Sequence, residues 1–357
     1  MPSPLVTVLL PTFRRPQMLA RALRSLLNQT WQDFQVVVCD NHSDDATADV
    51  VGKFSKMDSR IVYHCQPTNI GAQANFGWAF SQVRSEYFCL FSDDDILLPD
   101  CLTSEVEGLR QHPEAQAWGG VVLATGEDGS VSRWPPQAWP EGFSGPQAAC
   151  DLICRNLRPA NTGMLFRSSV LDSDFHPGYP DFHCSDVLWM LHAAAKGGIG
   201  ITNQPVAVFL QHAGSLSTRA GHDPEKGMEL YWPSVLYLLG HFPQGKLSVY
   251  EVAEFRRTLR FTYGVEQFRH LGRMAAIQGR QPVVSTCIRR LEDDFQDHPG
   301  ILRLRRLSAL PRVFLRLYFG IRYRIMAMKK VGDRRERSQD QQIALNAICS
   351  SVVTADT

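Results

Sequence analysis

Three consecutive carboxylates, Asp93, Asp94 and Asp95, follow the apolar run at residues 87–91. Adjacent carboxylates repel one another, which costs free energy unless water or a cation relieves the repulsion. Hard cations such as Mg²⁺ and Mn²⁺ prefer carboxylate oxygens and often share them with the phosphates of a substrate. The cluster therefore has two interpretations: a divalent-cation site, or a solvated acidic loop without a ligand.

The elements that must position this cluster are predicted by the apolar pattern of the first hundred residues. Short apolar runs that predict strands alternate with predicted helices, at residues 5–10, 16–28, 34–39, 46–54, 61–63 and 72–83. Apolar strands separated by helices imply a parallel sheet covered on both faces. Ligands bind outside the carboxyl ends of such strands, where Thr12, Asp40 and Asp93 all lie.

Two further polar segments follow predicted strands. Asp40 either caps a strand-to-helix turn or accepts hydrogen bonds from a base or a ribose. Gly71 lies in the segment 69–77, which is either a plain helix start with a tight turn or a helix N-terminus whose amides face a nucleotide. Each segment alone leaves both interpretations open.

Four motifs occur in order along residues 5–102: VLLPTF at 8–13, VCDNHSDD at 38–45, NIG at 69–71 with NFG at 75–77, and SDDDILLP at 92–99. In this order and spacing they resemble the inverting family 2 glycosyltransferases with the GT-A fold. The resemblance implies an α/β fold with a Rossmann-like, mostly parallel central sheet, flanking helices and a helical C-terminal region. It also implies a nucleoside-diphosphate sugar as donor, with UDP as the expected nucleotide.

The resemblance implies a role for each motif residue. Binding of the nucleotide sugar is implied for Pro11, Thr12, Asp40, Asn69, Gly71, Asn75, Asp93 and Asp94. It implies a Mn²⁺ or Mg²⁺ ion on the diphosphate, with Asp95 as the first choice of ligand, Asp93 as the second and His212 as a further candidate. Ser92 stands where the family often has another acid, so the division of roles among the three aspartates stays open.

The second half of the chain matches the family more loosely. The segment 183–189 resembles the start of a helix that carries the general base, which implies that Asp186 deprotonates the acceptor hydroxyl. Ser185 stands where the first acid of a pair is usual. The alternative is that Asp186 is an ordinary first-turn residue stabilised by the helix dipole, and Asp181 and Asp174 are nearby rivals for the base.

The implied reaction moves a sugar to a hydroxyl of a glycan or lipid-linked acceptor, as in polysaccharide biosynthesis, with inversion at the anomeric carbon. The alternative is a non-catalytic sugar-nucleotide or glycan-binding protein with a degenerate GT-A fold, which Ser92 and Ser185 keep open. A dinucleotide oxidoreductase is not indicated, because the G-x-G-x-x-G pattern does not follow the first strand.

Charge is distributed unevenly along the 357 residues. The whole chain carries +1, which does not indicate a nucleic-acid partner. Residues 301–337 hold twelve Lys or Arg against two acids, which is +10 and leaves −9 for the rest. This segment is either a helical region with a solvated charged face or a peripheral contact with an anionic membrane.

Length and cysteine usage complete the expectations. About two domains are expected: 1–222 as the GT-A domain, with a nucleotide half 1–102 and an acceptor half 103–222, then a helical region 223–337. The segment 338–357 has few apolar clusters and is expected to be a mobile tail. Nine scattered cysteines and an N-terminus that lacks a signal-peptide pattern favour a reduced, cytoplasmic protein, with the inner face of the membrane as a further option.

Overall fold

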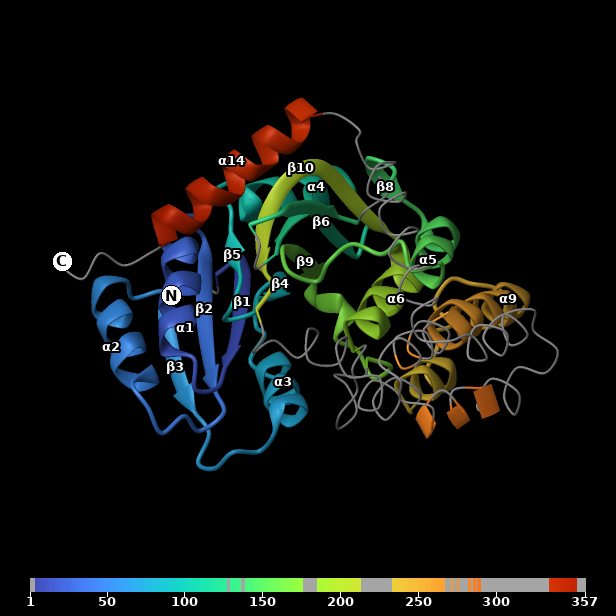
Figure 1. The fold of residues 1–357 in the computed structure, drawn as a ribbon, viewed down its shortest axis with the longest axis horizontal. Coiled ribbons are helices and arrows are strands. Elements are labelled where there is room, and N and C mark those ends of the chain that lie inside the picture. The colour runs from blue at the N-terminus through green and yellow to red at the C-terminus, as the bar shows by residue number, and fades with distance from the viewer. Residues whose placement is uncertain are drawn as a thin grey trace.

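A 10-stranded mixed sheet forms the centre of the structure (Figure 1). The computed structural model describes residues 4–126, 129–135, 139–175, 185–212, 233–266, isolated helical positions between 271 and 289, and 334–351. The strands are β1 (Val6–Thr12), β2 (Phe34–Asp40), β3 (Ile61–Cys65), β4 (Tyr87–Leu90), β5 (Ile96–Leu97), β6 (Ala117–Thr125), β7 (Val131–Trp134), β8 (Gly142–Ser144), β9 (Met164–Arg167) and β10 (Ile199–Leu210). The named helices are α1 (Pro16–Leu27), α2 (Thr47–Met57), α3 (Ala72–Phe80), α4 (Cys101–Gln111), α5 (Pro146–Cys154), α6 (Ser185–Gly197), α9 (Val249–Leu259) and α14 (Arg334–Ser351).

The order of the strands reverses beside β1. The sheet runs β3-β2-β1-β4-β9-β6-β10-β5, and β1 pairs in parallel with both β2 and β4. The chain therefore moves outward from β1 to β3 and then crosses back to β4 on the other side of β1. Such a reversal is a topological switch point, and a crevice opens there at the carboxyl ends of the two strands. Thr12 ends β1 and the aspartate cluster follows β4.

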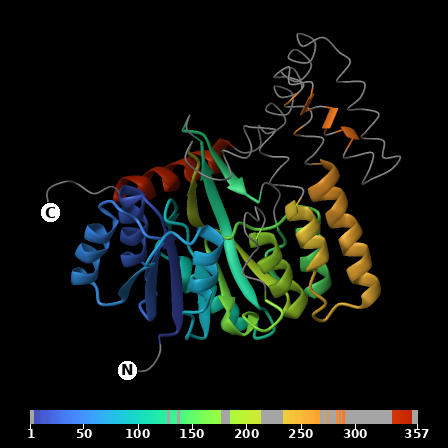
Figure 2. The ribbon, with the colours of Figure 1, turned by 90° about the horizontal axis from the view of Figure 1, so that it is seen from below.

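Alternate residues of the central strands face two different layers of helices. Val8 and Leu10 of β1 belong to a buried cluster with residues of α1, α2 and α4, whereas Leu9 belongs to a second cluster with residues of α3, α5 and α6. This follows from the two-residue period of a strand and explains why these strands read as continuous apolar runs. Figure 2 shows the helices on both sides of the sheet.

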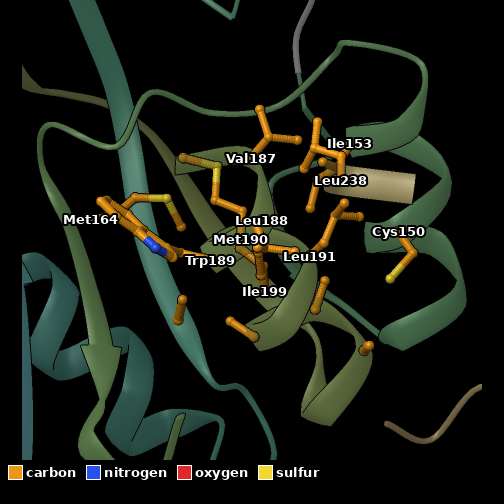
Figure 3. Packing of buried hydrophobic residues seen from close by; sticks show 14 of the residues in the cluster. Cys150, Ile153, Met164, Val187, Leu188, Trp189, Met190, Leu191, Ile199 and Leu238 are labelled. Atoms are coloured by element: carbon orange, nitrogen blue, oxygen red, sulfur yellow. The ribbon is translucent and has the colours of Figure 1, made fainter. Parts of the chain in front are cut away.

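Helix α6 lies at the centre of the second layer, with few positions open to solvent. Nearly every residue from Val187 to Ala195 is buried, so this helix is apolar on all sides, as expected for a helix inside a core. Figure 3 shows its side chains among Ile153 of α5, Met164 of β9 and Leu238 of the helix at residues 233–240. The rigid packing of α6 fixes the position of its first turn, where Asp186 lies.

Trp118 of β6 is held between two glycines on neighbouring elements. A Cβ atom added to Gly200 of β10 would lie 1.9 Å from the Trp118 ring, and one added to Gly108 of α4 would lie 2.3 Å from it. These two glycines therefore allow the indole to pack between α4 and β10, because any larger residue would overlap the ring.

The C-terminal helix contradicts the expectation of a mobile tail. Residues 338–351 belong to α14, which lies across β5, β7, β10 and α1 (Figure 1). Ala344 and Ala347, which lie one turn apart, pack against a buried apolar cluster of the sheet. Asp340 is 5% exposed and forms a bidentate ion pair with Arg133, at 2.7 and 2.9 Å. The apolar stripe is narrow, which is why the composition of this segment understated its packing.

The expected elements of the first hundred residues are confirmed, and so is the α/β class. Past residue 232 the structure describes helices at 233–240, α9 and the π-helix Arg260–Glu266, and residues 241–248 form a connection without helix or strand. The expected domain boundary at residue 222 and the basic residues 301–333 lie outside the described residues.

Candidate functional site

Thr12 and Asp93 meet at the switch point between β1 and β4. The Thr12 hydroxyl donates to Asp93 Oδ2 at 2.7 Å, and Arg15 Nη1 lies 3.1 Å from Asp93 Oδ1. Asp93 is 5% exposed, and this burial raises the pKa of its carboxyl group to about 6, against the opposing effect of the Thr12 hydrogen bond. The site therefore contains a carboxylate that is costly to ionise without a cation.

Asp94 contacts two side chains from distant elements, the guanidinium of Arg15 and the imidazole of His212. Its Oδ2 atom lies 2.9 Å from Arg15 Nη1 and 3.1 Å from His212 Nε2. Arg15 precedes α1, and His212 follows β10. His212 therefore lies beside the aspartate cluster, and its role as a metal ligand stays a prediction.

Asp95 is the most enclosed of the three aspartates. It is 1% exposed, Thr162 Oγ1 donates to its Oδ2 atom at 2.5 Å, and the backbone N–H of Leu210 donates to its Oδ1 atom at 3.2 Å. Burial, followed by the charge of Asp94, raises the pKa of Asp95 well above its usual range. Both oxygens of Asp95 thus accept hydrogen bonds from residues far away in the sequence, and its role as the first-choice metal ligand stays a prediction.

Asp40 is fully buried at the end of β2. Its Oδ1 atom accepts from the backbone N–H of Ser43 at 2.9 Å, and its Oδ2 atom accepts from the hydroxyl of Tyr63 at 2.6 Å. Burial, followed by this hydrogen bond, raises the pKa of Tyr63. A ligand that bonds to Asp40 must therefore approach beside Tyr63 or displace its hydroxyl.

The asparagines of the third motif build a loop beside Asp40. Asn69 Oδ1 accepts from Asn41 Nδ2 and from the backbone N–H of Gly71, both at 2.9 Å. Gly71 has φ 84°, a left-handed conformation that suits glycine, and α3 begins directly after it. Asn75 is 2% exposed and donates to the carbonyl of Cys39 at 2.7 Å. Asn75 thus ties α3 to β2, whereas Asn69 and Gly71 shape the loop.

Pro11 lies in β1 opposite Cys39 of β2 and directly precedes Thr12. It is only partly buried, so it is placed at the edge of the same crevice. Together, the nucleotide-sugar residues expected from the sequence gather around the carboxyl ends of β1, β2 and β4.

The first turn of α6 carries Asp186 and contacts the first turn of α3. Asp186 Oδ2 lies 2.7 Å from Arg158 Nη1, and the Ser185 hydroxyl lies 3.4 Å from Gln73 Oε1 in the first turn of α3. The contact of Ser185 with Gln73 places the first turn of α6 beside the Asn69–Gly71 loop. Of the rivals for the base, Asp174 is exposed on a turn, and Asp181 lies outside the described residues.

Four residues of the site were not predicted from the sequence: Arg15, Tyr63, Arg158 and Thr162. Arg15 adjoins the first motif, and its position at a strand end was an available signal. Tyr63 and Thr162 contact aspartates that lie 23 and 67 residues away in the sequence. Arg158 contacts Asp186, in the half of the chain that matches the family more loosely. No local pattern marks such long-range partners.

The aspartate cluster offers carboxylate oxygens to a divalent cation. Among the described residues, no three His, Cys, Asp or Glu side chains are arranged to hold a metal ion by themselves. Asp93 and Asp94 nevertheless bind the same cationic nitrogen of Arg15. Mg²⁺ commonly uses one or two carboxylates together with water and substrate phosphates, so this pair fits such a cation when a diphosphate supplies further oxygens.

The part of the chain that the structure describes has no helix that is long and apolar enough to cross a membrane.

Part of the chain matches a known protein family. A sequence model of "Glycosyl transferase family 2" matches residues 7–171. The chain is 34% identical over 131 residues to GalNAc(5)-diNAcBac-PP-undecaprenol beta-1,3-glucosyltransferase of Campylobacter jejuni, which covers 36% of this chain and 41% of that protein. It is 26% identical over 135 residues to an uncharacterized glycosyltransferase of Methanocaldococcus jannaschii, covering 37% and 47%. The chain thus spans less than half the length of these two relatives.

Two solved structures share the fold. TarS 1-349 of S. aureus in complex with UDP-GlcNAc aligns with a TM-score of 0.56 and 19% identity, over 85% of this chain and 88% of that one. The mannosyltransferase PcManGT of Pyrobaculum calidifontis, in complex with GDP-Man and Mn2+, aligns with a TM-score of 0.55 and 14% identity, over 99% and 88%. At these identities the likeness establishes architecture alone. Residues 7–171 of this chain, which hold the three aspartates together with Thr12, Arg15 and Thr162, therefore match glycosyl transferase family 2, within a fold of the GT-A type.

Proposed function

We propose that this chain is an inverting glycosyltransferase that moves a sugar from a nucleoside-diphosphate sugar, with UDP as the expected nucleotide, to a hydroxyl of a glycan or lipid-linked acceptor. The observation that carries the proposal is the convergence of Thr12, Arg15 and His212 on Asp93 and Asp94 at the switch point. In addition, the named relative from Campylobacter jejuni acts on an undecaprenol-linked substrate, and TarS and PcManGT bind UDP-GlcNAc and GDP-Man.

Asp93 and Asp94 would hold a Mn²⁺ or Mg²⁺ ion together with the diphosphate oxygens. When bound, such an ion supplies positive charge where negative charge grows on the leaving diphosphate. Asp95 would act indirectly, since its carboxylate joins the segment before β5 to Thr162 and to the end of β10. The main chain before β5 is thereby fixed, which keeps Asp93 and Asp94 in place.

Asp40 and the Asn69–Gly71 loop would enclose the nucleoside. Asp40 is held by Tyr63 and the Ser43 amide, so its carboxylate has a fixed orientation before any ligand arrives. A carboxylate with a fixed orientation loses little entropy when a nucleoside binds, and it discriminates between bases by the hydrogen bonds that they can donate to it. A donor panel with UDP-, GDP- and dTDP-sugars identifies the nucleotide.

Asp186 would remove the proton of the acceptor hydroxyl as the oxygen attacks the anomeric carbon. The carboxylate stands at the first turn of a buried helix and forms an ion pair with Arg158 at 2.7 Å. This ion pair holds the Asp186 carboxylate in one orientation, and a general base must be positioned in this way. Attack from the face opposite the diphosphate inverts the anomeric carbon, as in the single displacement of inverting glycosidases.

Replacement of the base tests the proposal. Asp186→Asn is expected to lower turnover by about 10²- to 10⁴-fold, while the affinity for UDP stays nearly unchanged. Asp151→Asn is the matched control, because Asp151 forms an ion pair with Arg155 on the exposed face of α5. Release of UDP from donor in the presence of Mn²⁺, and the anomeric configuration of the product by NMR, are the two measurements. A product with retained configuration, or full activity of Asp186→Asn, would contradict this mechanism.

We further propose that the protein works at the cytoplasmic face of a membrane through the basic segment 301–337. The segment carries +10, and each Lys or Arg near an anionic surface contributes about 1 kcal/mol of binding. Sedimentation of the purified chain with vesicles that contain anionic lipid is expected at low salt and lost at high salt. Failure to sediment at low salt would refute the membrane contact and leave the transferase proposal intact.

A further inference from the structure

Arg15 is the cation nearest to two of the three aspartates. Its Nη1 atom lies 3.1 Å from Asp93 Oδ1 and 2.9 Å from Asp94 Oδ2. The side chain of Arg15 is 29% exposed, and those of Asp93 and Asp94 are 7% and 12% exposed. One guanidinium therefore forms ion pairs with two largely enclosed carboxylates and offsets part of their negative charge.

The preceding arginine has a different environment. Arg14 forms an ion pair with Asp44 at 2.7 Å, and these side chains are 55% and 64% exposed. Solvent screens such a pair, so its removal changes little. Two neighbouring arginines of the same loop thus differ in burial and in partner, which provides a matched control.

We infer that Arg15 is a resident counter-cation of the donor site, which holds Asp93 and Asp94 while the site is empty, competes with a divalent cation for them, and turns to the donor diphosphate when the cation binds. The inference deepens the proposed function and rests on it. A guanidinium binds phosphate oxygens in the same forked manner as carboxylate oxygens, so a diphosphate offers Arg15 an equivalent partner. The exchange forms and breaks no covalent bond.

This arrangement makes the binding of cation and nucleotide cooperative. A divalent cation alone must displace Arg15 from both carboxylates, which breaks both ion pairs. When UDP is present, Arg15 moves to the diphosphate, and the cation gains both carboxylates and phosphate oxygens. Each ligand therefore strengthens the binding of the other, and the coupling is reciprocal.

Binding of Mn²⁺ alone and with UDP tests this exchange, without any need for turnover. The free Mn²⁺ signal in electron paramagnetic resonance gives the affinity of the full chain, of Arg15→Gln and of the control Arg14→Gln. Without UDP, Arg15→Gln is expected to bind Mn²⁺ about ten-fold more tightly than the wild type, and UDP is expected to strengthen Mn²⁺ binding about ten-fold less in this variant. Arg14→Gln is expected to behave like the wild type.

The inference is overturned if Arg15→Gln binds Mn²⁺ alone no more tightly than the wild type, or if neither protein binds it. Should Arg15→Gln fail to fold, Arg15→Lys decides the matter, because a single ammonium bridges two carboxylates less well than a planar guanidinium. About three-fold tighter binding of Mn²⁺ alone by Arg15→Lys supports the inference, and unchanged affinity refutes it. Release of UDP from donor by the wild type is measured in parallel. Its absence counts against the proposed function, whereas the comparison of Mn²⁺ affinities still judges Arg15.

Discussion

The hydrogen bond from Thr12 to Asp93 allows a quantitative prediction for Thr12→Val. Both residues are buried, at 4% and 5% exposure, and the oxygens are 2.7 Å apart. Valine keeps the volume and the strand preference of threonine but removes the donor. A hydrogen bond contributes about 0.5–1.5 kcal/mol between neutral groups and about 1.5–3 kcal/mol when one group is charged. Loss of the donor therefore penalises the ionised form of Asp93 by about 1.4 kcal/mol more than the protonated form.

This difference corresponds to about one pKa unit. The pKa of Asp93 is expected to rise from about 6 in the wild type to about 7 in Thr12→Val. Since its folded pKa lies above the unfolded value of 3.8, the folded protein binds more protons between these values, and stability from this group falls as pH rises through the window. Thr12→Val raises the upper end of this pH range, which is the folded pKa of Asp93. The substitution is therefore expected to lower the free energy of unfolding by about 1 kcal/mol at pH 4 and by about 2 kcal/mol at pH 8.

Urea unfolding in the presence of EDTA, at pH values from 4 to 8, measures this cost. The matched control is Thr7→Val on the same strand, because the Thr7 hydroxyl lies 2.7 Å from the neutral hydroxyl of Ser85 in a buried environment. The cost of Thr7→Val is expected to be independent of pH. A cost of Thr12→Val that is equally flat from pH 4 to 8 would refute the reasoning about Asp93.

Two further substitutions test the scaffold. Asp340→Asn removes one partner of the bidentate ion pair with Arg133, whose side chain is 32% exposed. We expect the free energy of unfolding in urea to fall by about 2 kcal/mol, less than for a fully buried pair. The control Leu345→Ala, at a half-exposed position of the same helix, should cost less than about 0.5 kcal/mol. Gly200→Ala places a methyl group 1.9 Å from the Trp118 ring, so we expect a loss of about 2–3 kcal/mol and a changed tryptophan emission, and wild-type stability would contradict the packing argument.

The sequence predicted the parts of the site that local patterns encode. The strands could be predicted from their apolar runs, and the residues that follow them, Thr12, Asp40 and the aspartate cluster, lie together because the carboxyl ends of parallel strands share one edge. Asn69 and Gly71 could be placed for the same reason, since the glycine takes φ 84° at the start of a helix.

The sequence did not predict how the environments of the three carboxylates differ. Those environments depend on donors that arrive from elsewhere, such as Thr162, 67 residues from Asp95, and the amide of Leu210, 115 residues away. Adjacent aspartates look equivalent in the sequence, whereas in the structure Asp94 faces Arg15 and His212, and Asp95 is enclosed. Three neighbouring carboxylates thus acquire different environments from tertiary contacts alone.

The C-terminal helix extends this dependence to the far end of the chain. Ile96, directly after Asp95, pairs with Val208 of β10, two residues before the Leu210 amide that bonds to Asp95. Both apolar side chains are buried in the cluster that Ala344 and Ala347 of α14 complete. Displacement of α14 would expose this cluster and loosen the pairing of β5 with β10, and the strand end that carries His212 would move with it. The segment expected to be a mobile tail therefore lies directly over the strands that hold Asp95 and His212 in place.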